Sequence, residues 1–575
     1  MLRRIPTFGG GIILALLATA CARRAPAPRA GSPYVDGRQC AGCHPAHWKT
    51  FRETGMGRSF FRAVPANMVE NFERGARFTH PASGRHYQMI RRGDRYFLRR
   101  SQTGFGGAET SVVEQEIHYV MGSGNHARSY LHRTPQNRLV QMPLTWYPDK
   151  GGYWAMSPGY DRADHLDFRR KITYDCMFCH NSYPEIPSGR DGAGADPLYP
   201  DKLPEGIDCQ RCHGPGRAHI EAVEQRRAPD SVRAAILNPA RLSAERQLDV
   251  CMQCHLETTS FALPNSIQRY ERGAFSFRPG EPLGDYLLHF DHAPGSGRAD
   301  KFEIVSSAYR LRQSACFQKS GGALLCTTCH SPHQALRGEQ AVEHYRAACL
   351  KCHAESLRVA GGRHPPQRDC LACHMPKRRT EDVIHAVMTD HRIQRRRPTG
   401  DPLAPLAERR DTYRGEVVLY YPASLAPSAG RDLYLAVAQV GQSSNLKAGI
   451  AQLETALRTH QPRDPAFYFD LAQAYLADGR PDRAIAMYEA ALERDARFLP
   501  ALRSLGAAWL KAGNRGRAVT ALEQAHAVDP RDPTTLHELG RAYHELGRGP
   551  EAVAAIQEAL RADPDFPEAH DTLGS

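Results

Sequence analysis

One short pattern, Cys-x-x-Cys-His, occurs seven times and constrains this chain more than any other feature. Its two thiols are spaced to bond the two vinyl groups of one haem, and the histidine supplies an axial nitrogen to the iron. Zinc sites would not need a histidine after every second cysteine, and a disulfide across two residues is a redox motif seldom used so often. The pattern predicts seven covalent c-type haems. The cysteines are Cys40, Cys43, Cys176, Cys179, Cys209, Cys212, Cys251, Cys254, Cys326, Cys329, Cys349, Cys352, Cys370 and Cys373.

The spacing of the motifs predicts an unusual domain between residues 36 and 398. Each motif ends in the proximal ligand of its iron: His44, His180, His213, His255, His330, His353 and His374. Seven haems leave roughly fifty residues for each, too few for a conventional apolar core around every one. We therefore expect a mainly α domain with little regular secondary structure, in which the porphyrins are the core.

The interval between the first and second motifs differs from the rest of this domain. The segments 86–90 and 95–99 are rich in residues that favour strands, and they flank Gly93-Asp94, which is typical of a hairpin turn. The segments 138–142 and 152–156 would extend the hairpin. The sequence thus predicts a small antiparallel β insert over about residues 76–160.

The second axial position of each haem decides its chemistry. An iron with two protein ligands transfers electrons, whereas an open iron can bind a substrate. Small residues around His126 would let the backbone approach a porphyrin, and His165 precedes the second motif closely. His219 and His333 follow the third and fifth motifs, and each is expected to serve a neighbouring iron. Hydrogen bonding to a propionate or the backbone is the structural alternative for each of these histidines.

The amino terminus has the pattern of an export signal. Two arginines precede a short apolar run over residues 11–18, which is too short for a confident membrane span. The segment 17–21 resembles a lipoprotein signal in which Cys21 would be lipidated, and an ordinary cleavage site is the alternative. We predict a signal peptide over 1–21, a Pro- and Ala-rich linker over 22–35, and a periplasmic or cell-envelope protein whose membrane contact is a lipid anchor.

The net charge is +13, which would ordinarily suggest an acidic partner such as nucleic acid. Each ferric haem, however, carries roughly one net negative charge from its propionates, so seven haems offset much of the excess. Many arginines are expected to pair with propionates. We therefore predict no nucleic-acid partner.

The carboxy-terminal part has a different composition and a strict repeat. After a Pro-rich connector over 399–430, Leu471, Leu505 and Leu539 recur at intervals of 34 residues, and glycines and alanines keep the same phase. The pattern over 431–575 resembles the tetratricopeptide repeat, an α-solenoid built from helix pairs. The resemblance implies a groove for a protein or peptide ligand; a scaffold that only stabilises the haem domain is the alternative.

The motif region also resembles a known superfamily. The segments following Cys209 and Cys326, and Cys370-Leu-Ala-Cys-His-Met-Pro with a downstream Thr-Asp-His391, are similar to multihaem c-type cytochromes: the tetrahaem cytochrome of hydroxylamine oxidation, pentahaem nitrite reductase and hydroxylamine oxidoreductase. The resemblance implies that histidines after the last motif are distal ligands, which favours His391 first and His385 second. Nitrite reductases mark their catalytic haem by a Lys in place of the proximal His, and this chain has no Cys-x-x-Cys-Lys.

These observations favour an exported cytochrome that relays electrons between redox partner proteins, with the repeats docking one of them. The alternative is a multihaem oxidoreductase that acts on a small nitrogen or sulfur compound at one five-coordinate haem. The motifs do not distinguish the two, because they encode only the proximal ligand.

Overall fold

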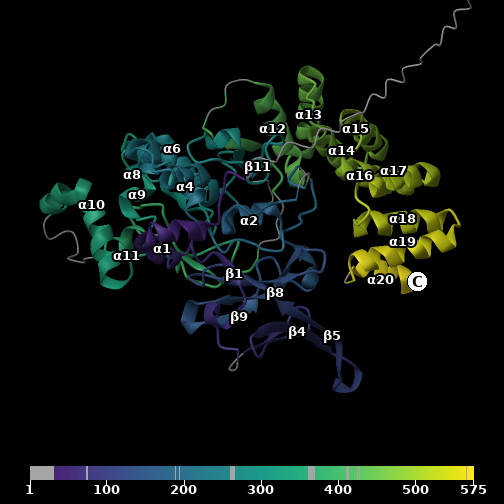
Figure 1. Cartoon of the computed structure of the whole chain (residues 1–575), viewed down its shortest axis with the longest axis horizontal. Coiled ribbons are helices and arrows are strands. Elements are labelled where there is room, and N and C mark those ends of the chain that lie inside the picture. Colours follow the sequence, from purple (N-terminus) through teal and green to yellow (C-terminus); the bar gives the residue numbers. More distant parts are fainter. Residues whose placement is uncertain are drawn as a thin grey trace, which may run out of the picture.

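The computed structural model describes residues 32–72, 76–187, 190–192, 194–259, 266–360, 369–408, 413–423, 425, 428–564 and 566–574. The predicted signal peptide 1–21, its Cys21 and the linker up to residue 31 lie outside the described residues. Figure 1 shows three parts: a β-rich part at the bottom, a part with short helices that carries the motifs, and a solenoid along one side.

The motif-bearing part consists of short helices joined by irregular segments, as predicted. Several of these helices are little longer than the motif that they carry. They are α1 (Pro45–Arg52), α2 (Tyr174–His180), α3 (Gln210–His213), α4 (Arg217–Glu224), α5 (Pro229–Ala234), α6 (Ala244–His255), α7 (Ser307–Arg312), α8 (Ala315–Lys319), α9 (Cys326–Cys329), α10 (Gly338–Ala360) and α11 (Leu371–His374).

The β-rich part contains two antiparallel sheets rather than one. The hairpin predicted around Gly93 joins β3 to β4, and Arg92 pairs with Arg95. The segments expected to extend it belong instead to a six-stranded sheet of order β1-β6-β7-β8-β10, with β9 beside β8. The strands of the two sheets are β1 (Phe60–Arg62), β2 (Arg77–His80), β3 (Arg85–Arg92), β4 (Arg95–Thr103), β5 (Glu109–Ile117), β6 (Tyr119–Met121), β7 (Arg128–Arg133), β8 (Leu139–Tyr147), β9 (Tyr153–Met156) and β10 (Arg170–Lys171).

A conventional apolar core lies where these two sheets meet. Tyr87 and Leu98 from one sheet are buried together with Tyr130 and Leu144 from the other. Strand periodicity in the sequence identified the first hairpin and two strands of the second sheet, β8 and β9, but not the pairing of β1 with β6 or of β10 with β8, which joins strands that are distant in the chain. The strands extend from residue 60 to residue 171, beyond both ends of the predicted insert.

The segment predicted as a connector contributes a strand to the motif-bearing part. A three-stranded sheet of order β11-β12-β15 is formed by β11 (Ser266–Gln268), β12 (Leu287–His292) and β15 (Val417–Tyr421). Leu288, Phe290 and Val417 from this sheet share one buried cluster with the first solenoid helices. The solenoid is therefore packed onto the cytochrome part through a continuous apolar core.

The solenoid consists of antiparallel helix pairs with the predicted period. Its turns fall at Gly479, Gly513 and Gly547, whose φ angles of 76°, 75° and 75° favour glycine. Residues 429–460 form the first pair, α12 and α13. The helices are α12 (Ala429–Val440), α13 (Leu446–His460), α14 (Ala466–Ala477), α15 (Pro481–Arg494), α16 (Leu499–Lys511), α17 (Arg515–Val528), α18 (Pro533–Glu545), α19 (Gly549–Ala562) and α20 (Pro567–Gly574).

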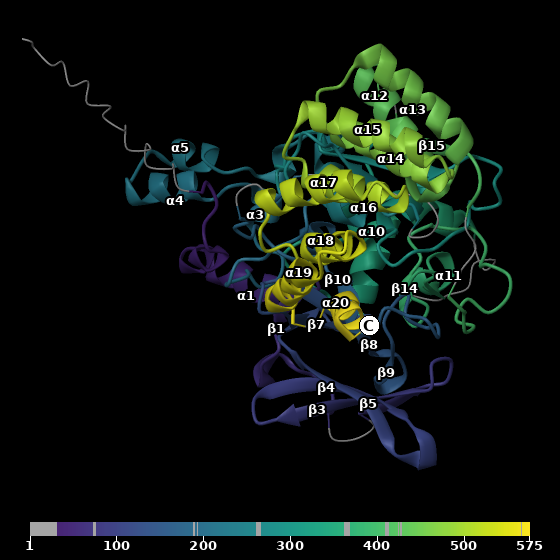
Figure 2. The same ribbon diagram turned by 90° about the vertical axis from the view of Figure 1, so that its right-hand side faces the viewer.

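Polar contacts also join the solenoid to the rest of the chain. The Tyr270 hydroxyl donates to Asp470 on α14, and the Tyr434 hydroxyl on α12 donates to Glu271 at 2.9 Å. Farther along, Arg190 pairs with Asp529 at 2.6 Å. Figure 2, turned by 90° from Figure 1, shows the solenoid helices running from α12 down to α20 near the β-rich part. Within the described residues, no helix is both long and apolar enough to cross a membrane.

Candidate haem sites

The motifs form tight helical turns that place their ligands on one face. The backbone N–H of His213 donates to the carbonyl of Cys209 at 2.9 Å, and His330 and His374 make the same bond to Cys326 and Cys370. Residues three and four apart lie side by side on such a turn, so both thiols and the imidazole face the same way. This arrangement suits one haem held by two thioethers and one axial nitrogen.

Hydrogen bonds fix the tautomer of several proximal histidines. Nδ1–H of His213 donates to the carbonyl of Leu237 at 2.8 Å, and Nδ1–H of His374 donates to Gln394 at 2.7 Å. His180 makes a longer bond of this kind to Ser59, at 3.3 Å. A carbonyl only accepts, so each of these bonds places the proton on Nδ1 and leaves Nε2 unprotonated, the form in which an imidazole binds a metal.

Three of the predicted distal histidines have the same hydrogen-bond signature. Nδ1–H of His126 donates to Val387 at 3.0 Å, that of His219 donates to Val232 at 2.9 Å, and that of His391 donates to Thr389 at 3.0 Å. Each ring therefore presents Nε2 as a free ligand nitrogen. Burial lowers the pKa of His126 and of His391, which favours the neutral, ligating form of both imidazoles.

One hairpin after the seventh motif orients three of these rings. It contains β13 (Lys377–Arg379) and β14 (Val387–Thr389). Its carbonyls at residues 387, 389 and 394 accept the Nδ1–H bonds of His126, His391 and His374 respectively. We call residues 377–394 the post-motif hairpin. This hairpin brings His126, from the interval between the first and second motifs, close to the seventh motif and the residues that follow it.

A buried ion pair fixes the post-motif hairpin to α7. Arg310 and Asp390 have fully buried side chains, and Nε and Nη2 of Arg310 contact the two carboxylate oxygens at 2.9 and 2.7 Å. Burial alone would raise the pKa of Asp390, but the hydrogen bonds and charge of Arg310 outweigh it and lower that pKa. Bidentate pairs of this kind hold their partners in a defined orientation.

Two predicted distal histidines are placed differently. Both ring nitrogens of His165 contact protein groups: Nδ1 accepts from the backbone N–H of Asp167 at 3.0 Å, and Nε2 lies 2.9 Å from Arg85 and 3.1 Å from the Tyr87 hydroxyl. Burial is the main cause that lowers its pKa to about 4. His165 is thus a neutral hydrogen-bonding group of the β-rich part, and this arrangement leaves it no free nitrogen for a metal.

The ring of His385 packs against tyrosines of the β8–β9 hairpin. Its centroid lies 5.1 Å from that of Tyr147 and 6.1 Å from that of Tyr153.

The remaining predicted ligand, His333, contacts two other imidazoles: its centroid is 5.0 Å from that of His47 and 6.0 Å from that of His213. The structure therefore brings His333 to the third motif, as expected for a residue that serves a neighbouring iron.

Thiols of different motifs meet in pairs. The neighbouring pairs are Cys40 with Cys209, Cys179 with Cys254, Cys251 with Cys326, and Cys349 with Cys370. The first motif is thus next to the third, the fourth is next to both the second and the fifth, and the sixth is next to the seventh. All seven motifs have at least one such neighbour, which the sequence alone does not reveal.

Buried polar atoms among the motifs also fit a haem. Arg211, inside the third motif, is 1% exposed, and its Nε and Nη1 have no hydrogen-bond partner. Its guanidinium lies over the Phe178 ring of the second motif at 4.0 Å. Nε2 of His292 is likewise buried without a hydrogen-bond partner, whereas its Nδ1 lies 3.4 Å from the Asp291 carboxylate. Unsatisfied buried donors and ring nitrogens are costly in a protein, whereas propionates and iron would satisfy them.

Sequence reasoning did not single out two of these residues. Arg211 carries no sequence signal, because any residue type can stand between the two cysteines. His132 carries no motif signal either, yet its Nδ1–H donates to the carbonyl of Glu116 at 2.9 Å and leaves Nε2 free. Its position on β7, within the β-rich part, gave no motif to recognise.

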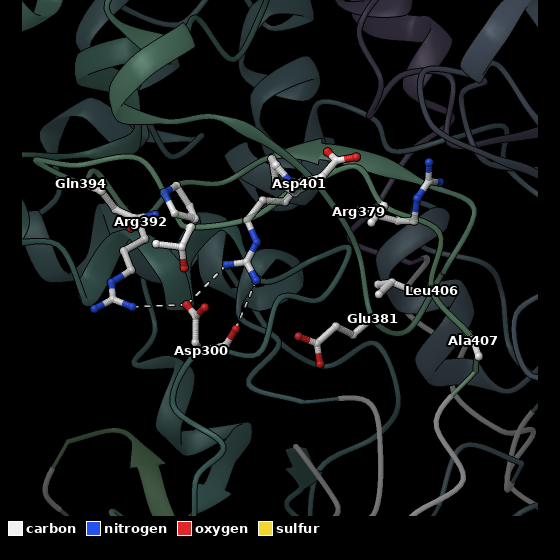
Figure 3. Close-up of a pocket in the computed structure, with 13 residues that line it drawn as sticks. Asp300, Arg379, Glu381, Arg392, Gln394, Asp401, Leu406 and Ala407 are labelled. Atoms are coloured by element: carbon white, nitrogen blue, oxygen red, sulfur yellow. Dashed lines mark hydrogen bonds and ion pairs between the residues drawn. The ribbon is translucent and has the colours of Figure 1, made fainter.

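A cavity of about 400 Å³ adjoins the seventh motif (Figure 3). Its wall includes Gln394, whose carbonyl holds the proximal His374. Two arginines that line it, Arg378 and Arg392, both pair with Asp300 at 3.3 Å. The Asp300 carboxylate therefore partly neutralises both guanidinium groups, and the lining of the cavity does not form a purely cationic site for an anion.

Comparisons with known proteins support both parts of the chain. Residues 319–357 match the family model described as a doubled CXXCH motif, and residues 440–497 and 510–574 match tetratricopeptide-repeat models. The chain is similar to the "Multiheme cytochrome MtrA" of Shewanella baltica (strain OS185), with 23% identity over 199 residues, or 33% of this chain. The match spans 55% of the length of that relative.

Solved structures resemble the solenoid part. The structure "MamA 41-end from Desulfovibrio magneticus RS-1" is 22% identical, covers 26% of this chain and 84% of that one, and has a TM-score of 0.25. The TPR protein YrrB is 17% identical, covers 26% of this chain and 75% of that one, and has a TM-score of 0.24. The motifs, their geometry and the family matches together identify the chain as a multihaem c-type cytochrome fused to carboxy-terminal tetratricopeptide repeats.

Proposed function

We propose that this protein is an exported heptahaem cytochrome that relays electrons between redox partner proteins of the cell envelope. The observation that carries the proposal is the set of contacts between thiols of different motifs, which makes each motif the neighbour of another. A haem bound at each motif supplies a one-electron Fe(III)/Fe(II) couple.

The chain's own residues account for the rest of the proposed role. The motif turns aim two thiols and one imidazole at a common face, and carbonyls such as those of Leu237 and Gln394 keep Nε2 unprotonated. His126, His219, His333 and His391 are the distal ligands that we propose. A relay needs two protein ligands at each iron, because these prevent small molecules from binding and limit structural change between oxidation states.

Mass spectrometry and redox titration of the purified protein test this function. The intact mass should exceed that of the processed chain by seven haems, and no free thiol should remain in the motifs. Reductive titration should take up seven electrons per chain, with low-spin spectra throughout. A high-spin haem that binds nitrite or hydroxylamine and turns it over would instead establish the oxidoreductase alternative.

Export and lipidation are tested at the amino terminus. We propose that the chain is cleaved before Cys21 and that this cysteine carries the lipid anchor. Mass spectrometry of the mature amino-terminal peptide should find an acylated cysteine, and cell fractionation should recover the protein with the envelope. A free, unacylated terminus would leave the ordinary cleavage site as the explanation and overturn the lipoprotein assignment.

We propose that the solenoid also docks a protein partner, through the faces that are not packed against the cytochrome part. The support is the repeat family itself, whose members present extended binding surfaces. Leu546 and Val553 are exposed apolar residues on this array, at 41% and 47%. Replacing both with Asp should slow electron exchange with the host's periplasmic fraction while leaving the redox titration unchanged. An unchanged rate would contradict docking at this surface.

A further inference from the structure

Two pairs of histidine rings from different motifs are separated by nearly the same distance. The ring centroids of His213 and His333 lie 6.0 Å apart, with an angle of 8° between the ring planes. Those of His330 and His391 lie 6.1 Å apart, with an angle of 36°. Each pair combines a proximal histidine with one that lies outside the motifs.

This separation is the one that two ligands of a single ion require. Two metal–imidazole bonds of about 2 Å each, plus about 1.1 Å from ring nitrogen to ring centre on either side, separate the centroids by roughly 6 Å. The contact between His333 and His47, at 5.0 Å and with an angle of 42°, is too short for such an arrangement. His47 therefore packs against His333 rather than sharing an iron with it.

Hydrogen bonds give the ring nitrogens the required roles. Nδ1–H of His213 donates to Leu237, and Nδ1–H of His391 donates to Thr389, so each ring offers Nε2. The two remaining rings, His330 and His333, stand three residues apart after Cys329. One short turn thus directs two imidazoles toward partners from two different parts of the chain.

We propose that the turn 326–333 is a junction between two haems: His333 is the distal ligand of the haem held by His213, and His391 is the distal ligand of the haem held by His330. This inference rests on the proposed function, since it needs haems at the third and fifth motifs. It adds which haems are neighbours and which residue supplies the second axial ligand of each iron. The third and fifth haems are then joined by the three-residue step from His330 to His333.

Single substitutions test the distal roles. In His333→Ala and in His391→Ala, one haem in seven should become high-spin in the ferric electron paramagnetic resonance spectrum and should bind one carbon monoxide when reduced. His333→Met should remain low-spin and titrate at a higher potential, because a thioether ligand raises the potential of the couple. His86→Ala is the matched control, because that half-buried ring bonds Thr79 and Thr103 of neighbouring strands.

Double substitutions test the pairing itself. If His213 and His333 serve one iron, the pair His213→Ala/His333→Ala should alter one haem, whereas His213→Ala/His391→Ala should alter two. The haem count from intact mass is measured in every variant, so a haem lost during maturation is counted as altered. Two altered haems in the first double variant would overturn the pairing.

The proposed function fails in a different way. A parent protein with fewer than seven covalent haems would contradict the heptahaem assignment without any histidine being changed. A parent with seven haems whose His333→Ala variant stays entirely low-spin would contradict only the junction. The two rings would then be an offset stacked pair with no shared iron.

Discussion

Removing one partner of the ion pair between Arg310 and Asp390 should cost several kcal/mol, because both side chains are fully buried and the remaining charge would lose its partner. Breaking a buried pair by removing one partner typically costs about 3–5 kcal/mol, since the other charge is left uncompensated. In Arg310→Met, Asp390 keeps the Nη1 contact of Arg378 at 3.2 Å and the backbone N–H of Arg392 at 2.9 Å. We therefore expect the lower end of that range, about 3 kcal/mol.

Denaturant unfolding followed by the Soret absorption would measure this loss, with Arg392→Met as the matched control. The Arg392 side chain is 40% exposed, and its carboxylate partner Asp300 is 64% exposed. Exposed pairs contribute about 0–1 kcal/mol, so the control should be nearly as stable as the parent protein. Equal losses in the two variants would refute the argument from burial.

The pair also predicts a pH dependence with a definite sign. The pKa of Asp390 is lowered in the folded protein despite its burial, because of Arg310. A group whose pKa is depressed by folding stabilises the protein above its unfolded pKa, and this contribution is lost as the pH falls. Acidification should therefore narrow the difference in stability between the parent and Arg310→Met. A gap that widens at low pH would contradict this assignment.

Two further predictions concern the solenoid. Burial raises the pKa of Asp470, beside Tyr270, to about 7, so the folded protein keeps a proton that the unfolded chain releases at lower pH. The free energy of unfolding should therefore fall as the pH rises toward 7. Asp470→Asn should flatten this pH dependence in thermal scans. A Cβ at Gly506 would lie 2.5 Å from Leu522, so Gly506→Ala should destabilise by about 1–3 kcal/mol, although alanine favours helices. A Cβ at Gly516 would meet nothing within 4 Å, so Gly516→Ala should leave stability unchanged or raise it. If Gly516→Ala proved more destabilising than Gly506→Ala, the close packing of Gly506 against Leu522 would be contradicted.

The sequence predicted the features that are local or periodic. The seven motifs and the 34-residue repeat are written in consecutive residues, and the helical turns and helix pairs follow directly from them. The hairpin at Gly93 was predictable for the same reason, because its strands are adjacent in the chain. Such features depend on spacing and backbone preference rather than on distant contacts.

Features that depend on distant contacts were not predictable in the same way. His165 shortly precedes the second motif, as a distal ligand could, yet Arg85 and Tyr87 of β3 contact its Nε2. Conversely, the carbonyl of Val387 orients His126 from 261 residues away. The residues next to a histidine indicate how closely its backbone can approach a haem. Whether its ring can bind iron depends on the hydrogen bonds that each ring nitrogen makes to distant residues.

Under the proposed pairing, such distant contacts would also stabilise the motif-bearing part of the chain. His213 and His333 are 120 positions apart (333 minus 213), and His330 and His391 are 61 apart (391 minus 330). In the chain-entropy treatment of cross-links, closing a loop of about 100 residues stabilises the folded state by roughly 4.7 kcal/mol. A proximal ligand adjoins its own thioethers and closes almost no loop, whereas a distal ligand drawn from another motif constrains much of the domain. The histidines that set the spin state of the haems would then also be cross-links within residues 36–398. The stability that each one adds should grow with the logarithm of the number of residues in the loop it closes.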